Sequence, residues 1–98
     1  MARIIIWSIE AQISRRDIFD YWNFRNKSKI YSRSLNKQFV KSLKLIANLS
    51  EIGLPTDLIN VRIQIESHFQ IIYSISETTI IVLDVWDTRQ IPKNNPFK

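Results

Sequence analysis

The chain has 98 residues and a net charge of +5, from 14 Lys and Arg against 9 Asp and Glu. Its length suits one domain with a single core, and its 45% apolar content excludes a disordered chain. The absence of Cys excludes disulfides and thiolate chemistry, and the single His argues against a multi-histidine metal site.

The apolar runs, the N-terminal sequence and the net charge indicate where the protein acts and what it binds. The longest apolar runs are about four residues, against the roughly 20 that span a bilayer, and the N-terminus lacks the pattern of a signal peptide. We therefore expect a soluble, cytoplasmic protein, with residues 1–98 as one domain and with no metal or cofactor. The positive charge favours acidic partners such as nucleic acid, a ribosome or an acidic protein segment, although many soluble domains carry a similar charge.

The chain opens with a predicted strand and a predicted helix. Residues 3–9 are rich in β-branched and aromatic side chains, which favours a strand closed by Ser8. Over residues 11–27, apolar side chains recur at helical spacing on one side. Ser14 followed by Asp17 is the expected capping signal, unless the helix begins earlier.

A second helix, after a polar break at residues 26–29, has the clearest pattern in the chain. Its apolar positions recur in steps of three or four, and its outer side is basic. Gly53 and then Pro55 indicate where it ends, so the two helices should form an antiparallel hairpin. The apolar positions are Tyr31, Leu35, Phe39, Leu43, Ile46 and Leu49, and the basic ones are Arg33, Lys37, Lys41 and Lys44.

Three strands are predicted after a loop over residues 54–59. Residues 61–66 alternate in polarity, which predicts a half-buried strand, and residues 69–75 alternate as well. The tight link between them indicates a hairpin. Residues 79–86 are apolar on both faces, which predicts a central strand covered on both sides, in part by a partner. The chain then passes into the tail of residues 91–98, which contains Pro and Lys.

The predicted order is β-α-α-β-β-β, an α+β fold with a helical hairpin packed on one face of a small, curved, mostly antiparallel sheet. This order and several local motifs resemble the RelE/ParE superfamily of toxins from type II toxin–antitoxin systems. The motifs are Ile6-Trp7-Ser8, then Ile18, Tyr21 and Trp22, then Tyr31 and Leu35, then Val61-Arg62, residues 69–73 and residues 81–89.

The resemblance implies a small cytoplasmic bacterial toxin, neutralised in a hetero-oligomer by an antitoxin encoded beside it. RelE-like members cleave mRNA in the ribosomal A site, and ParE-like members inhibit DNA gyrase. Fold alone does not choose between the two activities, so the site residues must.

Two positions depart from the ribonuclease pattern that a RelE-like member would carry. Gln70 stands where such nucleases commonly have an Arg, and Asp87 stands where they have a His or another basic residue. Gln brings no positive charge to a developing phosphorane, and an anion repels phosphate. We therefore expect ParE-like binding of DNA gyrase, without enzymatic chemistry. The alternatives are a ribosome-dependent mRNA endoribonuclease and an inactive, antitoxin-binding member.

Individual residues each allow a functional and a structural interpretation. Arg89 follows the last strand and could contact a target or pair with Asp87. Arg62 could bind phosphate or form an ion pair with Glu66 or Asp84. A ribonuclease would use Arg62, His68 and Arg89, whereas target or partner binding would use Arg62, Gln64, Gln70, Trp86, Asp87 and Arg89.

Four further expectations concern burial and charge. His68 has a suitable pKa for acid–base work but lies at a hairpin turn, where a solvated His is more common. Tyr73 should be core, and Trp86 either covers the core or anchors a partner. Asp84, on a largely apolar strand and on one face with Val82 and Trp86, needs a partner such as Arg62 or Arg89. The basic helix face is a solvated surface or a surface for nucleic acid or an acidic antitoxin segment, and an antitoxin helix or strand could lie along an apolar groove.

Overall fold

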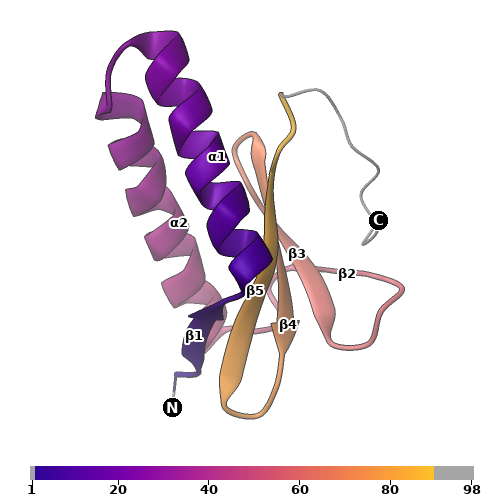
Figure 1. Cartoon of the computed structure of the whole chain (residues 1–98). Helices are drawn as coiled ribbons and strands as arrows, with labels where there is room; N and C mark the ends of the chain where they lie inside the picture. Colours follow the sequence, from indigo (N-terminus) through magenta and orange to yellow (C-terminus); the bar gives the residue numbers. More distant parts are fainter. Residues whose placement is uncertain (1, 90–98) are drawn as a thin grey trace.

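The structure, a computed structural model, describes residues 2–89 and shows two helices packed on one face of a five-stranded sheet (Figure 1). The strand order is β1-β5-β4-β3-β2; β1 runs parallel to β5, and the other neighbours are antiparallel. The predicted α+β class and mostly antiparallel sheet are therefore confirmed. The elements are β1 (Ile4–Trp7), α1 (Ile9–Asn26), α2 (Ile30–Asn48), β2 (Leu54–Pro55), β3 (Val61–Glu66), β4 (Phe69–Ile75) and β5 (Thr79–Asp87).

The tail of residues 91–98 lies outside the described residues. Within residues 2–89, neither helix combines the length and the apolar character that crossing a membrane requires.

The first helix begins at Ile9, directly after the strand. Ser8 is its N-cap: the Ser8 Oγ accepts a hydrogen bond from the Ala11 N–H at 3.1 Å and donates one to the Leu83 carbonyl at 3.1 Å. The prediction of Ser14 as the cap is wrong, because Ser14 lies inside α1. One serine thus closes the strand, starts the helix and ties both to β5.

The second helix ends at Asn48, earlier than the glycine predicted to end it. Gly53 has no positive φ and serves a close approach instead. Its N–H donates to the Tyr73 Oη at 3.0 Å, and a Cβ at this position would lie 2.6 Å from the same oxygen. The Tyr73 hydroxyl donates in turn to the Ser50 carbonyl at 2.8 Å, so β4 fastens the linker that follows α2. The expectation that Gly53 is a helix terminator is therefore wrong.

Tyr73 is a core residue, as expected from its phase in the strand. Burial raises the pKa of its phenol, and the Gly53 N–H and the positive charge of Arg62 lower it by less than burial raises it. The phenol therefore keeps its proton, and with it the bond to Ser50, at pH values where a solvated tyrosine begins to ionise.

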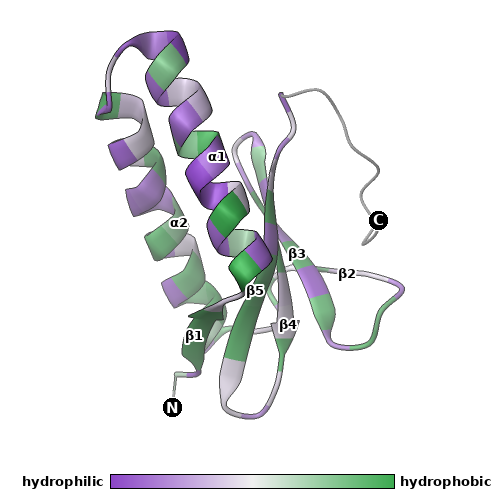
Figure 2. Ribbon diagram, viewed as in Figure 1, coloured by the Kyte–Doolittle hydropathy of each residue, from purple (hydrophilic) through white to green (hydrophobic). Residues whose placement is uncertain are grey.

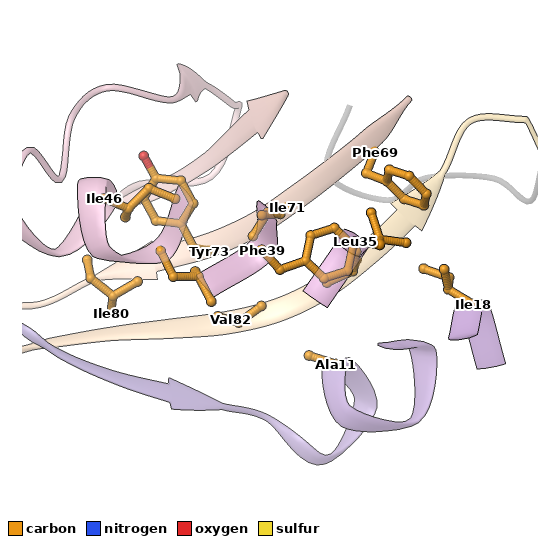
Figure 3. Close-up of a cluster of buried hydrophobic side chains, with 12 residues drawn as sticks. Ala11, Ile18, Leu35, Phe39, Ile46, Phe69, Ile71, Tyr73, Ile80 and Val82 are labelled. Carbon is orange, nitrogen blue, oxygen red and sulfur yellow. The ribbon is translucent and has the colours of Figure 1, made fainter. Parts of the chain in front are cut away.

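The main core lies between the helices and the sheet (Figure 3). Phe39 of α2 packs edge-on against Phe69 of β4, with ring centroids 5.4 Å apart. Burial of such large apolar side chains is the chief stabilising contribution, at about 25 cal/mol for each Å² removed from water. The side chains that Figure 3 labels are Ala11, Ile18, Leu35, Phe39, Ile46, Phe69, Ile71, Tyr73, Ile80 and Val82.

β5 is an interior strand of the sheet, as predicted, and lies between β1 and β4. The alternation of its side chains between the two faces is interrupted. Tyr73 pairs with Val82 and Ile72 pairs with Asp84, so Leu83 is the additional residue of a β-bulge. After the bulge, Val85 joins Val82 on the helix side, and Trp86 lies on the opposite side. The prediction that Val82 shares a face with Asp84 and Trp86 is therefore wrong, since one inserted residue exchanges the two faces.

The sheet face opposite the helices, which we call the open face, carries a second, smaller cluster. Val61 and Ile63 of β3 and Ile72 of β4 are buried there, with Leu83 and Trp86 packed against them. Towards β1 the open face is apolar but exposed, at Ile4, Ile6 and Ile81, and Figure 2 shows β1 and β5 as strongly hydrophobic ribbons. The helices thus cover one face of β5, and residues 2–89 cover the other face only over its C-terminal half.

The sequence placed Leu54–Pro55 in a loop, and this expectation is wrong. These two residues form β2, which pairs with Ile63 and Arg62 at the edge of the sheet. A two-residue strand is too short to leave a periodic pattern in the sequence.

Candidate functional site

Arg89, at the end of β5, is held by groups from three other parts of the fold. Its Nη2 donates to the Tyr31 Oη at 2.5 Å, and its Nε donates to the Asp87 Oδ1 at 3.3 Å. The guanidinium carbon lies 4.3 Å from the ring centre of Trp22 and 5.2 Å from that of Phe69. This arrangement combines charge-assisted hydrogen bonds with stacking on aromatic faces, which arginine makes better than lysine.

Asp87 lies behind Arg89, with its side chain 0% exposed. The Trp22 Nε1 donates to its Oδ2 at 2.7 Å, and the Arg89 backbone N–H donates to its Oδ1 at 2.9 Å. Both carboxylate oxygens are thus hydrogen-bonded, as a buried charge requires. Asp87 therefore positions Arg89, and its own carboxylate is out of reach of solvent.

The outer part of Arg89 remains accessible, with the side chain 31% exposed. Burial lowers its pKa, but the hydrogen bond from Arg89 to Tyr31 and the charge of Asp87 outweigh that effect, so the net pKa is raised. The guanidinium N–H groups outside these bonds have no partner among residues 2–89. The fold therefore presents a fixed, permanent cation with donors still available to a partner.

Trp22, Tyr31 and Phe69 form the rest of this site, and the sequence did not assign them to it. Trp22 and Tyr31 pack edge-to-face with ring centroids 5.3 Å apart, one from α1 and one from α2. The signal in the sequence was Asp87 itself, because a carboxylate after an apolar strand needs donors. Nothing local indicates that the donor is an indole 65 positions away.

Arg62 does not make either of the ion pairs proposed for it. Its Nη1 donates to the Gly53 carbonyl at 2.8 Å and to the Glu51 carbonyl at 3.2 Å, so it clamps the linker after α2. The expected partners are engaged elsewhere: the Ser42 Oγ donates to Glu66 at 2.7 Å, and Asp84 faces the open side. Among residues 2–89 the one side-chain ion pair is Arg89 with Asp87.

Asp84 finds its partners in its own strand. The Trp86 Nε1 donates to its Oδ2 at 3.2 Å, and the Val85 N–H donates to its Oδ1 at 2.8 Å. The expectation of Arg62 or Arg89 as partner is wrong, because the bulge turns Asp84 and Trp86 away from the helix side where both arginines bond. Trp86 is half-buried on the open face, and its Cα pairs with that of Gln70, which is 9% exposed.

The three residues that a ribonuclease would need do not converge. His68 is exposed in the β3–β4 turn, and its carbonyl accepts hydrogen bonds from Thr88, so it lies near Arg89. Arg62 lies towards the opposite end of β3, four residues before Glu66, a separation of about 13 Å along a strand. Gln64 lies half-buried between them on β3. In the described part of the chain, no group of three or more His, Asp or Glu side chains could hold a metal ion.

Comparisons with known proteins identify the family and the fold. Residues 5–92 match the sequence profile of a family described as the ParE toxin of the type II toxin–antitoxin system parDE. The structure is similar to a chain of the chromosomal ParDE TA system from P. aeruginosa, with a TM-score of 0.69 and 15% identity, covering 86% of this chain and 94% of that chain. At that identity the likeness shows the fold alone. No curated protein matches the sequence.

Proposed function

The chain belongs to the ParE toxin family of type II toxin–antitoxin systems, and from this premise we propose that it arrests growth by binding DNA gyrase. The assignment to the RelE/ParE superfamily, on its ParE side, is thereby confirmed. A cognate antitoxin is the partner that such a system implies, and it neutralises the toxin in a hetero-oligomer. The activity belongs to the cytoplasm, where gyrase acts on DNA.

The observation that supports binding rather than cleavage is the arrangement at the end of β5. A metal-independent ribonuclease needs an acid, a base and positive charge gathered around one phosphate. Here the Arg89 cation is paired with a buried Asp87, and Arg62 is committed to the linker carbonyls. The Asp87 carboxylate is so close to the Arg89 guanidinium that it weakens the attraction of that cation for a phosphorane. The same carboxylate fixes the orientation of the guanidinium.

A fixed cation is well suited to binding a protein target. Arg89 is already ordered by Trp22, Tyr31 and Asp87, so contact with a partner costs little further side-chain entropy. Its remaining N–H groups can donate to carboxylates or carbonyls of the target. We therefore propose Arg89 as the contact residue and Asp87 as the residue that positions it.

The antitoxin has a separate surface available on the open face. A groove there runs between the β2 loop and the strands, lined by Leu54, Pro55, Ile63, Ile65 and Gln70 among others. With Ile65 52% exposed, this surface is apolar enough to receive an apolar helix or strand of the antitoxin. Trp86, half-buried on the same face, is proposed as an anchor for that segment.

Expression in growing cells without the antitoxin tests the proposed function. Wild-type protein should arrest growth and relax plasmid DNA, and co-expressed antitoxin should restore both. Arg89→Ala should weaken the arrest, whereas Lys44→Gln, which removes one exposed positive charge from α2, should not.

Two outcomes contradict the proposal. Growth that continues unchanged would leave an inactive, antitoxin-binding family member. Arrest with normally supercoiled plasmid and cleaved mRNA would instead identify a RelE-like ribonuclease.

A further inference from the structure

A groove runs between α1 and α2, and no strand residue lines it, so it lies on the side of the hairpin away from the sheet. We call it the helix groove. Positive charge dominates its lining: the charged side chains are Arg15, Arg16, Lys29, Arg33, Lys37 and one acid, Asp20. Figure 2 shows purple, hydrophilic bands along both helices.

The cations of the helix groove form no ion pair with a carboxylate of residues 2–89. The one ion pair among residues 2–89 is Arg89 with Asp87, so no carboxylate lies within ion-pair distance of any of them. Arg15 lies over the Trp7 ring at 4.1 Å, and Arg16, Lys29, Arg33 and Lys37 are exposed. Unpaired like charges on one face raise the local potential and attract a polyanion.

The rest of the lining favours phosphate over an amphipathic protein segment. Asn23 and Asn36 place amide groups among the cations, and such groups commonly contact nucleic-acid phosphates. α2 also has no acidic residue in its first turn, so the positive end of its dipole is not offset there. An amphipathic helix would need a continuous apolar stripe. The apolar lining of the helix groove, Ile9, Ile13 and Phe19, comes from α1 alone, whereas the open face is apolar across neighbouring strands.

We propose that the helix groove binds the sugar–phosphate backbone of duplex DNA. This inference rests on the proposed function, because gyrase is engaged on DNA when the toxin meets it. Lys29 of the groove is two residues from Tyr31, which holds Arg89. The DNA-binding face and the gyrase-binding residue therefore adjoin at one end of the hairpin, and the toxin can contact the enzyme and its DNA together.

Fluorescence anisotropy with a labelled duplex of about 20 base pairs tests the inference without gyrase. Wild-type protein should bind with an affinity that falls steeply with KCl concentration. Arg16→Gln/Arg33→Gln/Lys37→Gln should bind at least about tenfold more weakly at low salt. For this variant, the slope of log K against log [KCl] should be smaller in magnitude by about 3, since each phosphate contact contributes about 0.9 to that slope.

A matched control removes the same charge from outside the helix groove. Lys27→Gln/Lys41→Gln/Lys44→Gln should keep the wild-type salt slope within about 1, because these lysines do not line it. Equal weakening by the two triple variants, with both folded by circular dichroism, would overturn the inference, since net charge alone would then explain binding. Tighter binding of an acidic peptide or of single-stranded RNA than of the duplex would overturn it as well.

Gyrase inhibition, measured separately, distinguishes failure of the inference from failure of the proposed function. A wild-type protein that inhibits gyrase but binds no duplex contradicts the inference and leaves the proposed function standing. A protein that binds duplex through this groove but does not inhibit gyrase supports the groove assignment and contradicts the proposed function.

Discussion

The bond between Trp22 and Asp87 should be the principal link between α1 and the end of β5. It joins an indole N–H to a carboxylate oxygen at 2.7 Å, and the carboxylate side chain is 0% exposed. A hydrogen bond to a charged group contributes about 1.5–3 kcal/mol. Solvent screens the ion pair between the Asp87 and Arg89 side chains, because Arg89 is 31% exposed. Most of the effect of Asp87 should therefore come from its hydrogen bonds with the Trp22 indole and the Arg89 backbone N–H.

A double-mutant cycle measures this bond. Asp87→Asn keeps the shape, but either orientation of the amide places an NH₂ against the Trp22 or the Arg89 N–H, so we expect a loss of about 2–3 kcal/mol. Trp22→Phe leaves one carboxylate oxygen unpaired and should cost about 2–3 kcal/mol, including the smaller ring. Since the same bond cannot be lost twice, the double variant should be less destabilised than the sum by about 1.5–2 kcal/mol.

Urea unfolding followed by far-UV circular dichroism gives these free energies without relying on tryptophan fluorescence. Asp17→Asn, an exposed carboxylate on α1, is the control and should change stability by less than about 0.5 kcal/mol. If the losses of unfolding free energy in the two single variants add up to the loss in the double variant within about 0.5 kcal/mol, the bond does not link α1 to β5.

Three further predictions concern the core. Because burial raises the pKa of Tyr73, the folded chain keeps a proton that the unfolded chain releases above about pH 10, so stability should fall as pH rises past that value. Tyr73→Phe should reduce this fall. If urea unfolding shows the same loss of stability between pH 9 and pH 11 for the wild type and for Tyr73→Phe, the prediction is contradicted. Gly53→Ala should cost about 1–3 kcal/mol and lower the Tm, because its Cβ would meet the fixed Tyr73 hydroxyl; an unchanged Tm would argue against this contact. Ile72→Ala should cost about 2–5 kcal/mol although it lies on the open face, whereas Ile59→Ala, at 89% exposure, should be nearly neutral; similar losses would rule out the open-face cluster.

The elements that the sequence predicted well have patterns that repeat locally. The apolar steps of α2 and the alternation of β3 each reflect one buried face, and both were visible over a few turns or residues. β4 also alternates in sequence, but residues 69–73 are buried on both faces of the sheet. The cap was misplaced because Ser8 and Ser14 both precede helical sequence, and only contact with Leu83 distinguishes them. The bulge at Leu83 was missed since one inserted residue in a largely apolar strand leaves no trace in its composition.

The candidate site was predictable only where its groups are neighbours in the chain. The pairing of Arg89 with Asp87, two residues apart, was one of the alternatives that the sequence offered, and the structure shows it. Trp22 and Tyr31 come from two helices and reach the site only through the packing of the hairpin on β5. Long-range hydrogen bonds of this kind depend on the three-dimensional fold and have no spacing rule in the sequence.

Supercoiling of relaxed plasmid by purified gyrase is the most direct test of the account. We predict that the antitoxin-free protein inhibits the reaction, that Arg89→Ala raises the concentration needed for half-inhibition at least about tenfold, as loss of a buried charged contact does, and that Lys44→Gln leaves it unchanged. Full gyrase activity in the presence of the wild-type protein, together with cleavage of mRNA on programmed ribosomes, would contradict the account.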